Sequence, residues 1–182
     1  MKFDIKFRPL RLDDAQFIND LRQNEQMEGM LGGAIRPVSY ERDVKWVEGL
    51  MLNDNQAIIY YAVTELDNDD IIGYTSISEI DYRNGTCFWS GIKIDQNRAR
   101  KGYGTQIALK VVKHAFEELR MVRIKGECLE HHQVAINLML KVGYVKEGLM
   151  RKTVFKNGIH NNQWLFSQTD ADYEATKSKF GL

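Results

Sequence analysis

Apolar residues recur at helical spacing in two segments near the start of the chain. The segment after Asp13 and the segment after Ser39 each place their apolar residues on one helical face. Asp and Ser side chains accept hydrogen bonds from the first amides of a helix, so both residues are predicted to be N-caps. The chain is therefore expected to open with two amphipathic helices.

From residue 57 the spacing changes to short runs rich in β-branched and aromatic residues. These runs are IIYYAVTEL, IIGYTSISEI and CFWSGIKI, and the turn clusters DNDD and DYRNGT separate them, which predicts an antiparallel meander. Helical spacing returns at 104–119 and alternation follows at 120–128. A strand, a helix and a strand in this order predict a parallel crossover.

The last part of the chain predicts a helix, a hairpin and another helix. A short helix over 133–142 is stopped by Gly143, and an Asn157-Gly158 turn joins two extended runs. Thr169 with Asp172 can cap the final helix. The whole order predicts an α/β (α+β) layer fold around one mixed sheet. With no repeat and no linker, the 182 residues are expected to form a single domain over 1–182.

Composition excludes several classes of function. Lys and Arg total 25 and Asp and Glu total 25, so no overall field favours nucleic acid or an anionic membrane. No apolar run reaches the roughly 20 residues of a membrane span, and the start MKFDIKFRPL lacks a signal-peptide core. A cytoplasmic protein is expected. Cys87 and Cys128 show no CxxC spacing and are predicted to be buried thiols.

The stretch NRARKGYGTQIALK, residues 97–110, joins a strand to a helix through two glycines. Gly102 and Gly104 let the backbone approach a ligand, and the unpaired amides of a helix N-terminus attract anions such as a pyrophosphate. A glycine turn with solvated basic side chains is the alternative. A dinucleotide fingerprint fails at Ile107, and a phosphate loop of the GxxxxGK[ST] kind fails because Lys101 precedes Gly102. The cluster RARK is one short basic run, too weak to predict a nucleic-acid site.

Two ordered motifs then carry a resemblance. IKIDQNRARKGYGTQIALKVVKHAF followed by ECLEHHQVAINLMLKVGYVKEG resembles the acetyl-CoA-binding core of the GNAT N-acetyltransferase superfamily. The later EGLMRKTVFKNGIHNNQWLFSQTDADY resembles the Rim-type branch, which includes ribosomal-protein alanine and spermidine acetyltransferases. The similarity covers most of residues 57–174, with a looser fit in RPLRLDDAQFINDLR.

The resemblance implies a fold and an activity. The fold would be a three-layer domain whose mixed, mostly antiparallel sheet of about seven strands is splayed between the strands around 86–95 and 120–128. The activity would be acetyl transfer from acetyl-CoA, by direct attack, to a primary amine of a small molecule, an amino sugar or a peptide N-terminus. Neither a metal, nor nucleic acid, nor a membrane is expected as a partner, and the sequence leaves monomer and homodimer open.

The resemblance also implies which residues contact the cofactor. They lie on the strand edge, in the glycine loop and at the following helix, and comprise Ile92, Lys93, Ile94, Arg98, Arg100, Lys101, Gly102, Tyr103, Gly104, Thr105, His132 and Asn137. Adjacent His131 and His132 face apart on a helix and lack completing ligands, so no metal site is predicted.

Departures from the family pattern affect the chemistry. Ala99 stands at the Gln/Arg position of the loop and His132 at the Asn position of the helix. Met139 stands where the family has the tyrosine that protonates the departing thiolate. Tyr103, His132, Tyr144 or water remain as proton sources. A second hypothesis is therefore a CoA-binding module that has lost its chemistry and acts as a sensor or regulator.

A base is useful because an amine of pKa near 10.4 is mostly protonated at neutral pH, and deprotonating it costs about 4 to 5 kcal/mol. Glu79 lies before the DYRNGT turn, is expected to share a strand face with Ile77 and Asp81, and is the predicted catalytic base. A plain surface carboxylate is the alternative, and Asp81 is the weaker candidate because it can form the turn. The segment 22–39 is expected to be a glycine-rich lid over the acceptor.

Overall fold

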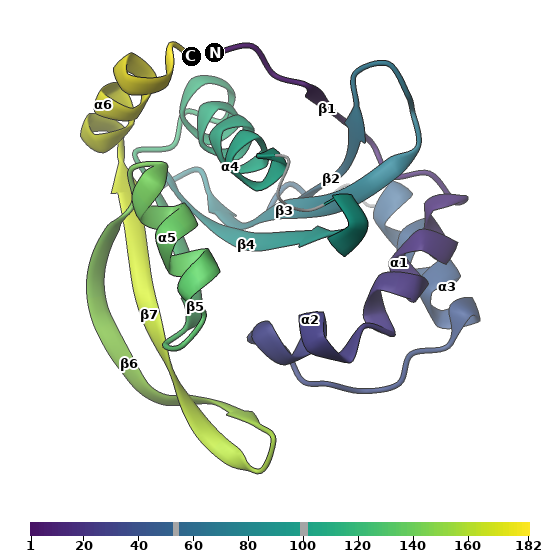
Figure 1. Cartoon of the computed structure of the whole chain (residues 1–182). Helices are drawn as coiled ribbons and strands as arrows, with labels where there is room; N and C mark the ends of the chain where they lie inside the picture. Colours follow the sequence, from purple (N-terminus) through teal and green to yellow (C-terminus); the bar gives the residue numbers. More distant parts are fainter. Residues whose placement is uncertain (53–54, 99–101) are drawn as a thin grey trace.

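The computed structural model describes residues 1–52, 55–98 and 102–182. These residues form one sheet with helices around it (Figure 1). The elements, in chain order, are β1 (Ile5–Arg8), α1 (Asp14–Arg22), α2 (Glu25–Met30), α3 (Tyr40–Met51), β2 (Ile59–Glu65), β3 (Ile71–Asp81), β4 (Thr86–Ile94), the 3-10 turn η1 (Gln96–Arg98), α4 (Tyr103–Lys113), the π-helical turn η2 (His114–Glu118), β5 (Arg123–Leu129), α5 (Gln133–Lys141), β6 (Val145–Lys156), β7 (Ile159–Thr169) and α6 (Asp170–Phe180).

The seven-stranded sheet has the order β1-β2-β3-β4-β5-β7-β6. The strands β4 and β5 are parallel because α4 connects them as a crossover, and the other neighbouring pairs are antiparallel. The mixed, mostly antiparallel sheet expected from the sequence is confirmed. The predicted hairpin turn is also present, since Asn157 and Gly158 both have positive φ, as a type I′ turn requires.

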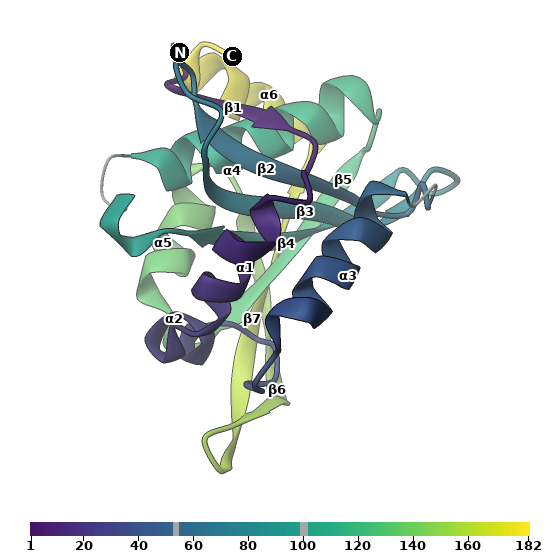
Figure 2. The same ribbon diagram turned by 90° about the vertical axis from the view of Figure 1, so that its right-hand side faces the viewer.

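The helices cover the sheet in two layers, and neighbouring residues of β2 show which face each layer takes. Ala62 packs in a cluster with residues of α1 and α3, whereas Val63 packs in the main core with residues of α4. Successive strand residues point to opposite faces, so α1 and α3 lie on one face and α4 on the other. Figure 2 shows α1 to α3 together in front of the strands. The three-layer arrangement expected from the sequence is therefore confirmed.

Local signals at helix ends explain several boundaries. The Ser39 hydroxyl caps α3, Thr169 and Asp172 form the predicted capping box of α6, and Gly143 (φ +94°) follows the end of α5. The prediction for Asp13 was wrong, because its side chain makes no capping hydrogen bond. Instead, the neighbouring Asp14 carboxylate accepts a hydrogen bond from the Arg11 N–H (2.7 Å). It also forms an ion pair with Arg8 of β1.

Both cysteines are buried and unpaired, as predicted. Burial raises the pKa of the Cys87 thiol to about 12 and that of the Cys128 thiol to about 11, so neither is a ready nucleophile. Within the described part of the chain, no helix is long and apolar enough to cross a membrane.

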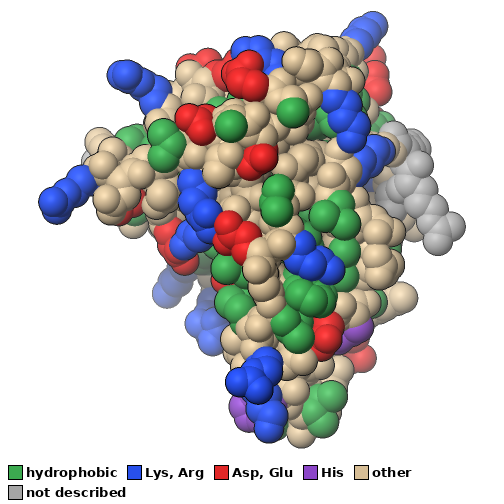
Figure 3. Space-filling model, turned by 90° about the vertical axis from the view of Figure 1, so that its left-hand side faces the viewer, with side chains coloured by type: hydrophobic (Ala, Val, Ile, Leu, Met, Phe, Trp, Pro, Cys, Tyr) green, Lys and Arg blue, Asp and Glu red, His purple; other side chains and the backbone are tan. Residues whose placement is uncertain are grey.

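The two edges of the sheet differ. The short strand β1 forms one edge, and the chain termini meet near it, where the Met1 ammonium donates to the Gly181 carbonyl (Figure 1). The long strand β6 forms the other edge and exposes Val145, Leu149 and Phe155. Figure 3 shows hydrophobic side chains mixed with Lys and Arg on this side of the molecule.

Candidate active site

The strands β4 and β5 are paired at their beginnings and separate toward their ends. Their parallel register ends at the pair Trp89–Gly126, and the residues beyond it, 90–94 and 127–129, are not paired with each other. Gly91, in the left-handed region at φ +86°, lies where β4 shifts its register against β3. The splay expected from the sequence is confirmed, and it leaves the backbone edge of 92–94 open toward β5.

A glycine-capped helix begins just past the open strand. Gly102 is the N-cap of α4 with φ +80°, and its carbonyl accepts the N–H groups of Thr105 and Gln106 at 3.1 and 3.2 Å. The earlier amides have no intrahelical partner and favour an anion. A Cβ added at Gly104 would meet only Leu138, at 3.9 Å, so the fold itself does not require glycine there. Close approach of a ligand would explain it.

The basic residues of the loop are partly engaged with β2. The Arg98 Nη1 lies 3.0 Å from Glu65 Oε1, and the Tyr103 hydroxyl donates to the same oxygen at 2.8 Å. This hydrogen bond raises the pKa of Tyr103, so its hydroxyl is not a ready proton source for a thiolate. Arg100 and Lys101 lie outside the described residues.

The polar face of α5 lies beside the beginning of α4. The Lys141 ammonium donates to the Thr105 hydroxyl at 3.1 Å, and Asn137, one turn earlier, accepts from Gln133 at 2.7 Å. Lys141 was missed as a candidate cofactor contact. Lys141 lies within ECLEHHQVAINLMLKVGYVKEG, one of the two stretches that carry the family resemblance, and this was the signal available in the sequence.

Met139 occupies the place where the family has its tyrosine. Its side chain is buried against β5, and a Cβ added at Gly126 would lie 2.2 Å from its terminal carbon. Tyr144 is buried beside them, burial raises its pKa well above the ordinary value, and its hydroxyl has no hydrogen-bond partner among the described residues. Burial and His131 lower the pKa of His132. None of these three side chains is suited to protonate a thiolate.

Glu79 lies on the opposite face from the one predicted. It has φ +50° in an irregular stretch where β3 and β4 shift register, while Ile77 and Ile80 both enter the core. The expectation that Glu79 shares a face with Ile77 was wrong because this bulge breaks the alternation. The Glu79 carboxylate is 65% exposed and lies 3.2 Å from the ammonium of Lys125. Asp81 accepts two turn amides, from Arg83 and Asn84.

A second carboxylate, Glu127, lies nearer to the splay. It is the first residue of β5 after the last pair with β4, on the same strand face as Lys125. Burial raises the pKa of Glu127, with a further contribution from Glu79, while Lys125 opposes the shift. The sequence analysis missed Glu127. The available signal was an acidic side chain at the carboxyl end of a parallel strand, where α/β sheets place their ligands.

The segment 22–39 is more ordered than a glycine-rich lid suggests. It contains α2, whose N-cap Asn24 accepts the Met27 amide at 2.9 Å. Glu28 of α2 forms an ion pair with Lys93 of β4, and the Glu28 carbonyl accepts from the Lys156 ammonium at 2.6 Å. These contacts hold α2 against both β4 and β6.

No group of three or more His, Cys, Asp or Glu side chains is placed to hold a metal ion in residues 1–52, 55–98 and 102–182. A splayed parallel pair, a glycine-capped helix N-terminus beside it and two carboxylates near the split are the features of the site. A family model described as an acetyltransferase (GNAT) domain matches residues 4–145. That match covers most of the chain, and the chain belongs to the GNAT acetyltransferase family. The family and enzyme class implied by the sequence motifs are confirmed.

Curated relatives and solved structures agree with this membership. The chain is 28% identical over 130 residues to the SPbeta prophage-derived uncharacterized N-acetyltransferase YokL of Bacillus subtilis (strain 168), covering 71% of each protein. It is 24% identical over 173 residues to the uncharacterized N-acetyltransferase p20 of Bacillus licheniformis, covering 93% of this chain and 94% of that protein. In fold it is similar to the spermidine N-acetyltransferase from Vibrio cholerae in complex with CoA and spermine, with a TM-score of 0.84 at 20% identity over 94% of this chain and 98% of that one.

Proposed function

We propose that this chain transfers the acetyl group of acetyl-CoA to a primary amine of a small molecule or a peptide N-terminus. The observation that carries the proposal is the split between β4 and β5, which opens beside the glycine-capped start of α4. A backbone edge and a helix N-terminus together suit a ligand with an amide-containing arm and a diphosphate. A structural neighbour from Vibrio cholerae is solved with CoA, which supports this choice of donor.

The cofactor contacts divide into backbone and side-chain groups. The edge of Ile92, Lys93 and Ile94 would pair with the pantetheine arm. The amides of Gly102, Tyr103 and Gly104, which precede the first intrahelical hydrogen bond, would bind the pyrophosphate. The second group would bind phosphate or ribose oxygens and comprises Arg98, Thr105, His132, Asn137 and Lys141, with Arg100 and Lys101 in the same loop.

Glu127 takes the role of base in this proposal, in place of Glu79. Its raised pKa makes its carboxylate a better proton acceptor near neutral pH, and it lies where the strands part. The acetyl thioester supplies an electrophilic carbonyl carbon. The amine nitrogen bonds to that carbon, the carbon–sulfur bond breaks, and Glu127 takes the proton from nitrogen. Glu79 and Lys125 act on Glu127 through its pKa.

The departing thiolate has no side-chain acid in this proposal. Met139 cannot donate a proton, and the hydroxyls of Tyr103 and Tyr144 have raised pKa values. A thiolate is stable enough to leave without one, since a free thiol has a pKa near 8.5. Solvent then sets its protonation state.

Steady-state release of CoA with a panel of amines tests the proposal. Glu127→Gln should lower kcat roughly a hundredfold or more, in the range that general-base catalysis contributes. Glu79→Gln is the matched control: it makes the same change at a carboxylate of β3 that is 65% exposed, and it should retain most of the activity. Binding of acetyl-CoA, measured by calorimetry, should be unchanged in both variants.

The two variants also separate the competing hypotheses. A protein that binds acetyl-CoA but turns over no amine would be the sensor predicted as the alternative. A larger loss for Glu79→Gln than for Glu127→Gln would restore the base assignment made from the sequence. Removing Glu79 also removes a negative neighbour, so the pKa of Glu127 should fall and the acidic limb of the pH–rate profile should move to lower pH.

A further inference from the structure

The short helix α2 is held in place mainly by polar contacts. None of its six described residues is buried, and Met27 packs only partly against the cluster formed by α1 and α3. A helix this short is marginal by itself and usually takes its position from the apolar surface that it buries. The position of α2 therefore depends on the side chains that reach it from the sheet.

The first such side chain comes from β4, in the part of the strand beyond its last pair with β5. The Lys93 ammonium forms an ion pair with the Glu28 carboxylate, and the two side chains are only 17% and 12% exposed. Ile92 and Ile94 pack against the main core with α4, so the alternation of the strand turns Lys93 to the opposite face of the sheet. Because the pair is largely shielded from water, removing one partner would leave the other charge poorly solvated.

The second side chain comes from β6, at the far edge of the sheet. Lys156 is only 5% exposed, and its ammonium donates to the main-chain carbonyl of Glu28 at 2.6 Å and to that of Leu31. Both carbonyls lie at the C-terminal end of α2, where a cation also favours the helix dipole. A buried ammonium is costly unless its donors have acceptors, so Lys156 stays buried while α2 lies against it.

These two links lie on opposite sides of the split between β4 and β5. In the sheet order β4-β5-β7-β6, the strands β5 and β7 lie between Lys93 and Lys156, so a segment linked to both must cross those strands. The chain after α2 does so at Gln163 of β7, because a Cβ added at Gly32 would lie 3.1 Å from the Gln163 amide nitrogen. Gln163 pairs with Leu129, at the end of β5. Residues 25–32 thus form a strap across the open end of the split.

The strap crosses the sheet on the face that carries the proposed base. Ile124 and Cys128 of β5 pack in the main core with α4, so Glu127 points to the opposite face, on which Lys93 also lies. Glu127 is two residues before Leu129, the strand residue that pairs with Gln163 beside the strap. Figure 1 shows α2 between the end of β4 and the hairpin of β6 and β7. The strap and the base therefore border the same open space.

We propose that the strap positions the acceptor amine, and that Glu28 and Lys156 are the positioning residues that hold it from the two sides of the split. This role rests on the acetyl transfer proposed above. The amine nitrogen has to reach the thioester carbon on the face of Glu127, and a strap fixed on both sides limits where the rest of the amine can lie. Glu28 joins both sides, since its carboxylate pairs with Lys93 and its carbonyl accepts from Lys156. Neither residue takes part in the chemical step.

Hydrogen exchange of the free protein measures the links directly. Lys156→Met keeps most of the apolar stem but removes both hydrogen bonds to α2, so the amides of residues 25–31 should exchange about tenfold faster. Lys152→Met removes an exposed ammonium from the same strand and is the matched control, which should leave this exchange unchanged. The amides of β5 and β7 should keep their rates in both variants, because the sheet does not depend on the strap.

Steady-state kinetics then tests the positioning role, with the best acceptor among glucosamine, spermidine and a peptide that begins with alanine. Lys156→Met and Glu28→Gln should each raise KM for the amine about tenfold, while kcat and the affinity for acetyl-CoA change less than about twofold. Each variant leaves the other link intact, so the double variant should raise KM further than either change alone. Lys152→Met should behave as the parent chain does.

Three results would overturn the proposal. Unchanged exchange of residues 25–31 in Lys156→Met would mean that this ammonium does not hold α2, and Glu28→Gln gives the same readout if Lys156→Met does not fold. Faster exchange with an unchanged KM for the amine would mean that the strap does not position the acceptor. An equal loss of acetyl-CoA affinity would mean that the strap shapes the whole site. A parent chain that acetylates no amine would instead overturn the proposed acetyl transfer, and the exchange rates would still show whether these contacts hold α2.

Discussion

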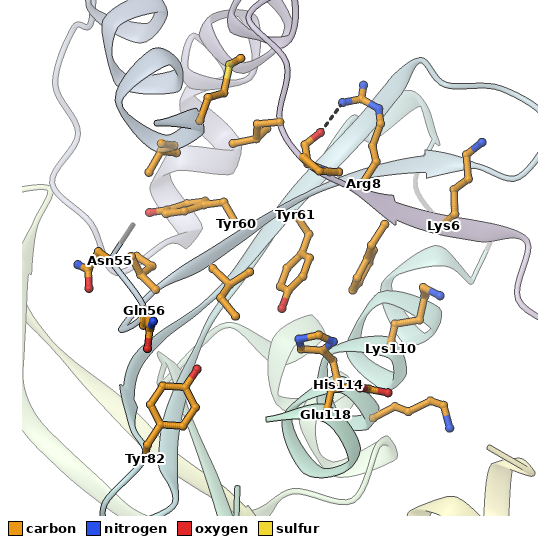
Figure 4. Close-up of a pocket in the computed structure, with 18 residues that line it drawn as sticks. Lys6, Arg8, Asn55, Gln56, Tyr60, Tyr61, Tyr82, Lys110, His114 and Glu118 are labelled. Carbon is orange, nitrogen blue, oxygen red and sulfur yellow. Dashed lines mark hydrogen bonds between the residues drawn. The ribbon is translucent and has the colours of Figure 1, made fainter. Parts of the chain in front are cut away.

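The two ends of α4 present different kinds of groups: main-chain amides at one end and side chains at the other. At its N-terminal end the groups proposed to bind the cofactor are main-chain amides that follow Gly102, next to the open backbone edge of β4. At its C-terminal end the side chains of Lys110 and of His114, the first residue of η2, line a cleft (Figure 4), and the His114 ring meets Tyr61 of β2 edge-on. The first end needs the correct backbone path and little else. The second needs several segments, distant in sequence, to bring particular side chains together.

This difference explains which of the two could be found from the sequence. Two glycines between a strand and a helix are a local signal. They indicate, within a few adjacent residues, a backbone that can take a positive φ and that a ligand can approach closely. A cleft lined from β1, α3, β2 and α4 leaves no local signal, since its parts become neighbours only after folding.

The largest expected effect comes from placing a charge at the backbone-built end. Gly104→Asp puts a carboxylate at the start of α4, where the diphosphate would bind, and its Cβ meets only Leu138 at 3.9 Å. Like charges this close cost several kcal/mol, so affinity for acetyl-CoA should fall roughly a thousandfold. The fold should remain stable, since a carboxylate suits a helix N-terminus.

Gly104→Ala is the control for this prediction. Its methyl group fits the same space, so the protein should keep its stability and lose less than about tenfold in affinity. Isothermal titration calorimetry gives the affinities and thermal unfolding gives the stabilities. If Gly104→Asp bound acetyl-CoA normally, the diphosphate would not lie at this helix end.

The next effect concerns a glycine that the fold itself requires. Gly143, at the end of α5, has φ +94°, and an added Cβ would lie 2.0 Å from the Thr176 hydroxyl and 2.7 Å from the Gln168 amide nitrogen. Gly143→Ala should lower the free energy of unfolding by about 3 kcal/mol, because it combines a strained φ with overpacking. Gly148 does not have a positive φ, and an added Cβ would meet no atom within 4 Å. Gly148→Ala should therefore change the free energy of unfolding little. Urea denaturation of both variants measures the difference.

How much the sequence could predict follows the same division between local and assembled features. Helix caps, the Asn157-Gly158 turn and the glycine junction are local, and the sheet arrangement follows from the order of elements together with the family motif. The predicted strand face of Glu79 was wrong because a bulge in β3 reverses the alternation of side chains. The sequence SISEID contains no glycine or proline that would indicate such a bulge. Helix α2 was missed because its six residues are held by Lys93 and Lys156 from distant strands.

The candidate base shows a further limit. Glu127 and Glu79 are 48 positions apart in the numbering, and only the pairing of β3, β4 and β5 brings them close enough for one to raise the pKa of the other. The sequence can place each carboxylate on a strand. It cannot show that they are neighbours, and this neighbourhood is what distinguishes a tuned base from a surface acid.

A smaller effect is expected from Lys141, a side chain of α5 that hydrogen-bonds to the start of α4. Lys141→Met removes the ammonium that donates to Thr105 but keeps an apolar stem. Affinity for acetyl-CoA should fall about fivefold, close to 1 kcal/mol, and its dependence on salt should weaken. Lys45→Met, an equal change of charge on α3 across the sheet, is the control and should have no effect. An unchanged affinity in Lys141→Met would mean that the main chain alone binds the diphosphate.

The smallest effect tests η2, the π-helical turn that continues α4, where ion pairs take the place of backbone contacts. Glu117 lies 2.5 Å from the Lys113 ammonium and 2.9 Å from that of Lys177, and these hydrogen bonds lower its pKa from 4.5 to about 2. A lowered pKa in the folded state stabilises the protein above the unfolded pKa, and this contribution is lost as pH falls from about 4.5 toward about 2. Because the groups are partly solvated, Glu117→Gln should destabilise the protein by less than about 1 kcal/mol at neutral pH.

The sign of this pH dependence is the informative part of the measurement. The difference in urea unfolding between the parent chain and Glu117→Gln should be full at a pH of about 7 and should shrink as pH falls from about 4.5 toward about 2, because protonation removes the charge that glutamine lacks. Acetyl-CoA affinity should be the same in both proteins, since the amides at the other end of α4 do not titrate. A gap in stability that stays constant with pH would mean that Glu117 acts through packing rather than charge, and the two ends of the helix would then be less different than their contacts indicate.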